Sequence, residues 1–105
     1  MGFPAQTNNG FILVKEDLAN LIIQLDRRYI QRKDLLPFTL DELGYLRNGI
    51  FALSGKIFKT EKYRQYFKAQ NWYHEVSSSD EKIAKMFNDY QVENLKVILA
   101  YEDEL

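Results

Sequence analysis

The sequence predicts an all-α fold: a single small domain of four or five short helices around an aromatic-rich core. Three observations lead to this class. Apolar residues recur at helical spacing in most segments, and residues with helix-capping side chains stand directly before several of them. No segment shows convincing strand alternation, because the one β-prone run, Phe11 to Val14, has no partner.

Length and composition fit one folded unit. The chain has 105 residues, which suits one domain and is too short for two ordinary ones. Hydrophobic residues make up 46% and aromatic residues 14% of it, enough to build a core. We therefore expect residues 1–13 to be a flexible N-terminal lead-in and residues 14–105 to form a single helical domain.

The first predicted helix covers residues 14–30. Tyr29 would continue its apolar stripe by one turn. Residues 33–38 should form a connection, because Pro37 cannot lie inside a helix and disfavours a helical conformation at Leu36. The stripe has the i, i+3, i+4, i+7 spacing of one helix face and consists of Leu18, Leu21, Ile22 and Leu25.

The second predicted helix covers residues 40–54. Thr39 and Glu42 have the spacing of a capping box, and Gly55 is placed to end the helix in the left-handed conformation. Two internal glycines each cost about 1 kcal/mol relative to alanine, so we expect a backbone or a bulky side chain to pack closely against them. The glycines are Gly44 and Gly49, and the buried stripe is Leu43, Leu46, Ile50 and Leu53.

Three further helices are predicted over residues 61–69, 80–87 and 89–102. Capping residues open the first and the last of them: Thr60, and the Asn88 and Gln91 pair. We expect these helices to pack through the following side chains: Tyr63, Tyr66 and Phe67; Ile83, Met86 and Phe87; Leu95, Ile98, Leu99 and Tyr101.

The formal charges are unevenly distributed along a chain of net charge −1. Residues 26–74 contain ten basic and five acidic side chains, whereas residues 75–105 contain three basic and eight acidic ones. We interpret these as a basic part and an acidic part that pack near each other, so that their opposite charges are complementary. The acidic C-terminal third argues against a nucleic-acid-binding protein, and no run of 18 or more apolar residues predicts a membrane span. No signal peptide is predicted in this chain.

Few residues suit catalysis or metal binding. Cysteine is absent and His74 is the only histidine, which disfavours a zinc site. The serines at 77–79 are expected to cap a helix, and the acidic run at 102–104 to be a solvated terminus. No Gly-rich phosphate loop is present. We therefore predict no catalytic residue, no metal site, no cofactor and no enzymatic activity.

Two groups of residues remain as candidates. Arg47 and Asn48 could grip an acidic ligand, or could tie helices together in a polar network that includes Asn94. A basic and aromatic segment could hold an acidic glycan, but its aromatic residues could instead be core and its basic ones a solvated helix face. The candidate ligand-binding residues in this segment are Lys59, Lys62, Arg64, Tyr66, Trp72 and Tyr73.

The order of these landmarks between Tyr29 and Glu102 resembles the YARHG domain, which is named for a Tyr-Ala-Arg-His-Gly run. The matching run is Phe51-Ala52-Leu53-Ser54-Gly55, so the Arg-His pair is replaced and no role of that pair carries over. Further matches are Lys33-Asp34-Leu35, Thr39-Leu40-Asp41-Glu42-Leu43, Leu46-Arg47-Asn48, Phe58, Tyr63, Tyr66-Phe67, Trp72-Tyr73, Phe87-Asn88, Asn94-Leu95, Ile98 and Tyr101.

The resemblance implies a bacterial, extracytoplasmic module of the kind attached to other domains or to lipoproteins. We therefore expect a noncatalytic binding module of a cell-envelope or secreted protein, which contacts peptidoglycan, another envelope polymer or an envelope protein. The alternative is a protein–protein adaptor or self-associating domain that docks through the stripe at residues 18–25.

Overall fold

The structure, a computed structural model, describes residues 17–105, and every regular element in this part is helical. The prediction of an all-α domain is confirmed. The expected lead-in at 1–13 and the start of the first helix lie outside the described residues. The elements are a helical segment at 17–22, α2 (Arg32–Leu35), α3 (Leu40–Leu53), α4 (Glu61–Lys68), α5 (Asp80–Ala84) and α6 (Asp89–Glu104).

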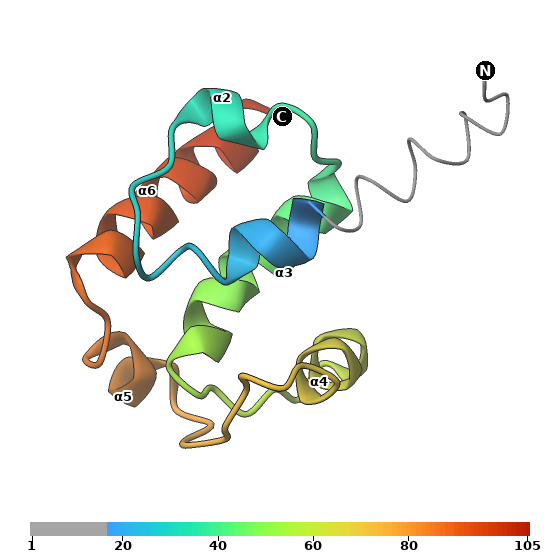
Figure 1. Cartoon of the computed structure of the whole chain (residues 1–105), viewed down its shortest axis with the longest axis vertical. Helices are drawn as coiled ribbons and strands as arrows, with labels where there is room; N and C mark the ends of the chain where they lie inside the picture. The colour runs from blue at the N-terminus through green and yellow to red at the C-terminus, as the bar shows by residue number, and fades with distance from the viewer. Residues whose placement is uncertain (1–16) are drawn as a thin grey trace, which may run out of the picture.

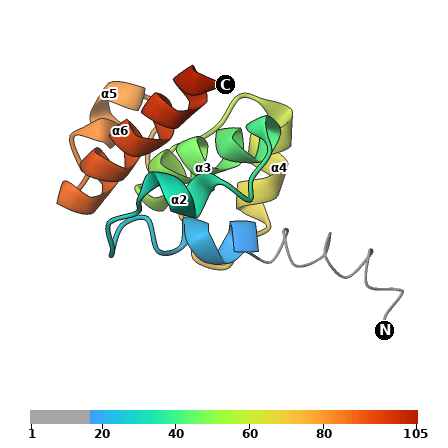
Figure 2. The same cartoon turned by 90° about the horizontal axis from the view of Figure 1, so that it is seen from above.

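Helix α3 is the central element. It contacts α4, α5 and α6, and α6 also packs against α2 (Figure 1). Seen from above, α6 and α4 lie on opposite sides of α3 (Figure 2). The core between them is continuous and is built mainly from α3, α6 and the 18–25 stripe, with Leu25, Leu35, Leu43, Leu46, Ile50, Phe67 and Ile98 fully buried.

The first helix is shorter than predicted. Regular helix ends at residue 22, and turns follow at 23–27 instead of a helix that continues to residue 30. The apolar stripe is buried as expected, but Tyr29 is 56% exposed and Ile30 takes the inward position. The physical reason is a set of hydrogen bonds from α6, which capture the backbone of this segment before it can complete another helical turn.

Asn94 makes three of these hydrogen bonds and is fully buried. Its amide nitrogen donates to the carbonyl of Leu25 at 2.9 Å and to that of Arg28 at 2.8 Å. Its amide oxygen accepts from the backbone N–H of Ile30 at 2.9 Å. One side chain therefore satisfies three backbone groups of a non-helical segment that would otherwise be buried without partners.

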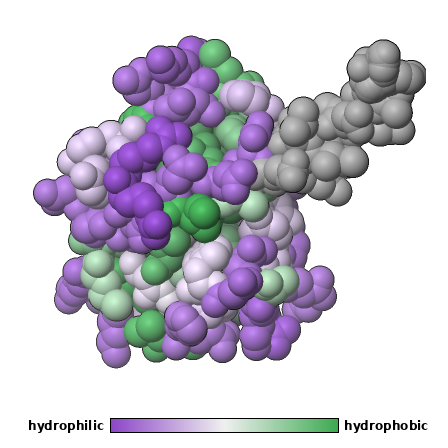
Figure 3. All heavy atoms as spheres, in the orientation of Figure 1, coloured by the Kyte–Doolittle hydropathy of each residue, from purple (hydrophilic) through white to green (hydrophobic). Residues whose placement is uncertain are grey.

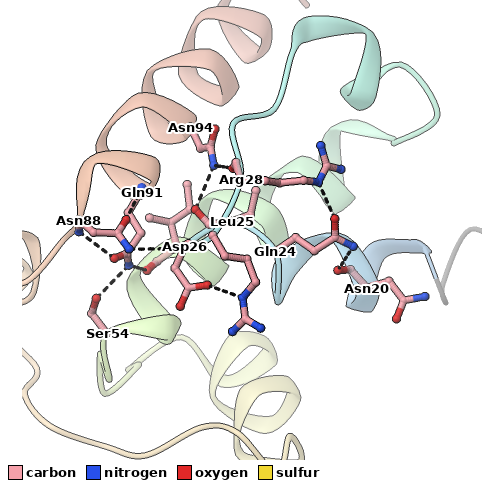
Figure 4. Close-up of polar contacts among 11 residues, drawn as sticks. Asn20, Gln24, Leu25, Asp26, Arg28, Ser54, Asn88, Gln91 and Asn94 are labelled. Carbon is pink, nitrogen blue, oxygen red and sulfur yellow. Dashed lines mark hydrogen bonds and ion pairs between the residues drawn. The ribbon is translucent and has the colours of Figure 1, made fainter.

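Two more amides on the same side of α6 extend this arrangement (Figure 4). Gln91 donates to the carbonyl of Ile50 at 3.0 Å and to the hydroxyl of Ser54 at 2.9 Å, so it holds the end of α3. Asn88 donates to the carbonyl of Asp26 at 2.7 Å and forms the predicted capping box with Gln91. Within residues 17–105, every buried side-chain polar atom has a hydrogen-bond partner.

The connection predicted at 33–38 is wrong, because α2 covers Arg32–Leu35. The carboxylate of Asp34 accepts from the backbone N–H of Gln31 at 2.8 Å and so caps the helix. Leu36 keeps helical dihedrals (φ −56°, ψ −35°) although Pro37 follows it. The turn is closed by a hydrogen bond from the N–H of Phe38 to the carbonyl of Leu35, and both of those side chains are buried.

Helix α3 agrees closely with its prediction, although it ends at Leu53 and not at Ser54. Thr39 and Glu42 form the capping box, and Gly55 follows the helix with φ +94°. A Cβ on Gly49 would lie 2.9 Å from Cγ2 of Ile22, and one on Gly44 would lie 2.6 Å from the Tyr63 hydroxyl. Both internal glycines therefore allow the close approach of a bulky side chain, as the sequence predicted.

Several predictions of inward-facing residues are wrong or only partly right, and Leu53 and Leu95 are only partly buried. Met86 is 53% exposed and Leu99 is 48% exposed. Helix α5 ends at Ala84, so residues 85–88 turn and Met86 points away from the core. Phe87 is half-buried, with its ring 5.1 Å from that of Phe51.

Replacing Asn94 should test the central polar contact. Asn94→Ala leaves three backbone groups without their partners, and we expect a loss of about 3 kcal/mol in the free energy of unfolding. Glu93→Ala, an exposed neighbour on α6, should change it by less than about 0.5 kcal/mol. Urea denaturation measures both. Equal effects of the two variants would contradict the assigned role of Asn94.

Gly55→Ala should destabilise the protein by about 2 kcal/mol, because its φ is left-handed and the new Cβ would meet Val76 and the carbonyl of His74. Val76 is 57% exposed, so Val76→Ala alone should be nearly neutral. The double variant should recover only part of the loss, since the backbone strain and the His74 carbonyl remain. Thermal unfolding of the three variants gives the comparison, and full recovery in the double variant would exclude backbone strain.

Candidate functional site

The predicted ligand-binding residues do not form one surface. Lys59 precedes α4, Lys62 lies in its first turn, and each lines a separate hollow next to Arg47. Arg64 is exposed on α4 and pairs with Glu61 at 3.5 Å. The aromatic candidates contribute to the core instead.

The first hollow has a volume of about 410 Å³ and is called the Lys59 hollow. Its walls come from α3, from the loop between α3 and α4, and from the segment that leads into α5. Three cations and one carboxylate line it, so its formal charge is positive. The lining residues are Arg47, Asn48, Lys56, Ile57, Phe58, Lys59, Thr60, Tyr63, Ser78 and Asp80.

The second hollow has a volume of about 490 Å³ and is called the Lys62 hollow. Two cations and two carboxylates line it. It shares Arg47 and Tyr63 with the Lys59 hollow, so the two adjoin, and together they are called the charged groove. Its lining residues are Leu40, Asp41, Gly44, Arg47, Lys62, Tyr63 and Glu102.

Backbone contacts position the loop that carries Lys56 and Lys59. Lys56 forms an isolated parallel bridge with Ser77, and the N–H of Ile57 donates to the Ser77 carbonyl at 2.8 Å. The hydroxyl of Tyr73 donates to the carbonyl of Lys56. The ammonium of Lys56 also lies 2.7 Å from the carboxylate of Asp80. The loop is therefore held against the segment before α5, which fixes one wall of the groove.

Arg47 joins α3 to α6. Its guanidinium makes a bidentate contact with the carboxylate of Glu102, at 2.8 Å from Nε and 3.2 Å from Nη2. This hydrogen bonding raises the pKa of Arg47 above its ordinary value. The geometry supports the structural interpretation of Arg47. The same side chain also lines both hollows, so an incoming acidic group would lie beside it.

The predicted polar network of Arg47, Asn48 and Asn94 is wrong as a single network. Asn48 donates at 2.8 Å to the carbonyl of Gly44, within its own helix. Asn94 bonds the segment at 25–30 and has no contact with Arg47. The three side chains share polarity and an apolar sequence context, but Arg47 bonds a carboxylate on α6, whereas Asn48 and Asn94 bond backbone groups of two different segments.

Lys62 is held above the second hollow by Asp41, whose carboxylate lies 2.7 Å from its ammonium. That hydrogen bond raises the pKa of Lys62. The ammonium also lies 5.1 Å from the ring centroid of Tyr63 and 5.7 Å from that of Tyr45. The position of Tyr63 depends in turn on Gly44, which leaves room for its hydroxyl.

The aromatic side chains next to the groove form a packed cluster and not an open platform. Phe67 is fully buried, as predicted, and Trp72 and Tyr73 pack around it with ring centroids at 6.2 and 6.3 Å. Tyr66 meets the rings of Tyr45 and Phe67 edge-on at 5.0 and 5.1 Å. Burial raises the pKa of both Tyr66 and Tyr73. The interpretation of this cluster as core is therefore favoured.

The interpretation of the charge distribution as complementary is supported by three ion pairs that join the basic and acidic parts. These pairs are Arg32–Glu104 at 2.8 Å, Arg47–Glu102 at 2.8 Å and Lys56–Asp80 at 2.7 Å. The acidic run at 102–104 is consequently not simply solvated, since the Glu102 side chain is only 16% exposed.

Sequence reasoning missed most of the lining of the groove, including all of its acidic side chains. Asp41, Asp80 and Glu102 supply its carboxylates, and Ser78 lines the Lys59 hollow. Their only signal in the sequence was the excess of acidic residues in the C-terminal part, which does not give pairings. Residues 17–105 contain no cluster of three metal-ligating side chains, and no helix within them is long and apolar enough to span a membrane.

The Arg47–Glu102 pair should couple measurably. In a double-mutant cycle with Arg47→Gln and Glu102→Gln, we expect a coupling free energy of about 1 kcal/mol, because the pair is bidentate and partly buried. The exposed Lys96–Glu93 pair of α6, treated in the same way, should give less than about 0.5 kcal/mol. Urea denaturation supplies both values. Similar couplings in the two cycles would show that Arg47 does not tie α3 to α6.

Comparison with known proteins agrees with this architecture. No curated protein and no solved structure is significantly similar to the chain. The sequence profile described as the YARHG domain matches residues 19–103, which extends the resemblance seen from Tyr29 onward into the first helix and its buried stripe. The match covers most of the chain and every named helix of the structure. The chain therefore belongs to the YARHG domain family.

Proposed function

We propose that the domain is a noncatalytic binding module of a bacterial cell-envelope or secreted protein, and that its charged groove holds an acid-bearing envelope polymer such as peptidoglycan. The observation that carries this proposal is the Lys59 hollow, where three cations face one carboxylate. Among the described residues, Lys59 has no carboxylate within ion-pair distance, so its ammonium is available to an acidic ligand.

Membership of the YARHG family supports the compartment, because members of the family are generally extracellular. The chemistry of the groove supports a noncatalytic role. Each of its carboxylates is paired with a cation: Asp41 with Lys62, Asp80 with Lys56, and Glu102 with Arg47. The lining that residues 17–105 give the groove also contains no histidine and no cysteine, the side chains that most often act as general base or nucleophile.

The alternative is an adaptor that docks through residues 18–25, and in this fold those docking residues are buried. Leu18 and Leu21 are each 7% exposed, Ile22 is 1% exposed and Leu25 is fully buried. The stripe packs against α3 and the rest of the core. A partner could reach it only after the domain had opened. Apolar residues on the face shown in Figure 3 lie in separate groups among hydrophilic ones, which does not favour another broad docking surface.

An NMR titration with soluble peptidoglycan fragments tests the proposal. At physiological salt, we expect amide shifts that cluster on the residues lining the charged groove. Lys59→Gln should weaken binding about fivefold, because it removes a cation that no internal carboxylate neutralises. Lys68→Gln is the matched control, since Lys68 is exposed at the other end of α4 and outside the groove.

Shifts that disappear on raising the salt from low to physiological concentration would indicate only a charged face. Equal weakening of binding by Lys59→Gln and Lys68→Gln would also indicate only a charged face. The absence of shifts at either salt concentration would reject the proposed ligand class.

A further inference from the structure

We propose that the charged groove recognises a short peptide that carries both a free carboxylate and a free amine, and not the sugar rings of an envelope polymer. This inference rests on the proposed function and specifies the part of the ligand that is bound. In peptidoglycan, that part would be the peptide that branches from the glycan strand.

Sugar rings usually stack on an exposed aromatic face, and the aromatic rings beside the groove are already engaged. Tyr63 borders both hollows, but its ring is met by Tyr45 edge-on at 5.0 Å and by the ammonium of Lys62 at 5.1 Å. Phe58, the other aromatic residue of the lining, is 4% exposed and stacks on Phe67. The groove thus has polar walls and no open ring face for a sugar.

The Lys59 hollow suits a carboxylate. Lys59 and Arg47 both line it, and the third cation, Lys56, pairs with Asp80, whose side chain is 66% exposed. Thr60 lies at the N-terminus of α4, and its hydroxyl makes no capping hydrogen bond. An acidic group there would therefore meet cations, a hydroxyl with spare capacity and the positive end of a helix.

The Lys62 hollow suits an amine. Lys62 uses only the Oδ1 oxygen of Asp41, whose side chain is 66% exposed, so Oδ2 keeps its acceptor capacity. The hydroxyl of Tyr63 faces the same hollow beside Gly44. With two cations and two carboxylates around it, this hollow carries no formal charge and does not repel an ammonium as the Lys59 hollow would.

The two hollows adjoin at Arg47 and Tyr63, so one ligand can occupy both. A ligand with acidic groups alone would use only the first hollow. A short peptide with charges of both signs satisfies both, which is why the arrangement favours an ampholytic peptide over an acidic glycan.

Four probes test the inference by NMR or calorimetry on the intact chain: a complete muropeptide, the tripeptide L-Ala-γ-D-Glu-L-Lys with its N-terminus acetylated so that the lysine amine is its only free amine, the same tripeptide with its lysine amine acetylated as well, and the peptide-free disaccharide of N-acetylglucosamine and N-acetylmuramic acid. We expect the tripeptide with the free lysine amine to bind within about threefold of the muropeptide. Acetylation of the lysine amine should weaken binding about tenfold, and the disaccharide, whose only charged group is its lactyl carboxylate, should bind at least as weakly as the acetylated tripeptide.

Two variants separate the two hollows. Asp41→Asn should abolish the preference for the free amine over the acetylated one, whereas Lys59→Gln should weaken both tripeptides equally. Glu61→Gln, an exposed acidic residue of α4 outside the groove, is the control for general charge effects. Circular dichroism confirms that each variant is folded.

Disaccharide binding as tight as that of the muropeptide would overturn the inference and leave the proposed function standing. A tripeptide indifferent to acetylation would also overturn it. If the muropeptide itself failed to bind, the proposed function would fail, and this inference with it.

Discussion

The hydrogen bonds of the Asn94 side chain are the contact on which the other elements depend. The segment between residue 22 and α2 has no regular structure of its own, yet it packs against α6 and buries Leu25 and Ile30. Its backbone groups need partners there, and Asn94 supplies three. With that segment fixed, the 18–25 stripe closes one side of the core, and α2 is directed onto α6.

Helix α6 is fastened along its length by two different kinds of interaction. Its first half uses the neutral amides of Asn88, Gln91 and Asn94, of which Gln91 and Asn94 are buried. Its second half uses the carboxylates of Glu102 and Glu104, which face arginines nearer the solvent. The two most deeply buried of these side chains, Gln91 and Asn94, are neutral, which agrees with the much smaller free-energy cost of removing an amide than a charged group from water.

Much of the fold could be predicted from local patterns. The capping boxes at Thr39 and Asn88 and the left-handed Gly55 act over a few residues, and each marks a helix boundary that the structure reproduces closely. Helix α2 could not be predicted in this way, because four residues are too short to show a period. The end of the first helix was missed because it depends on Asn94, more than sixty residues away in the sequence.

The candidate site shows the same limit. Lys59 and Lys62 were selected from sequence for their charge, and both line the groove, but the carboxylates that set its polarity come from other helices. The opposite charges of the two halves of the chain indicated that pairs would form. They could not indicate that Asp41 would pair with Lys62 in α4, since both residues belong to the basic half.

The residues that fasten α6 and those that line the groove are nearly separate sets, with Arg47 and Glu102 in both. This separation bears on how such a domain can diversify. Substitutions at Lys59, Thr60 or Asp41 alter the surface offered to a ligand and leave the amide contacts of α6 intact. Under the proposed binding function, natural variation could therefore change specificity at these positions at little risk to folding, whereas a change at Arg47 would have to preserve both the contact with α6 and the lining of the groove.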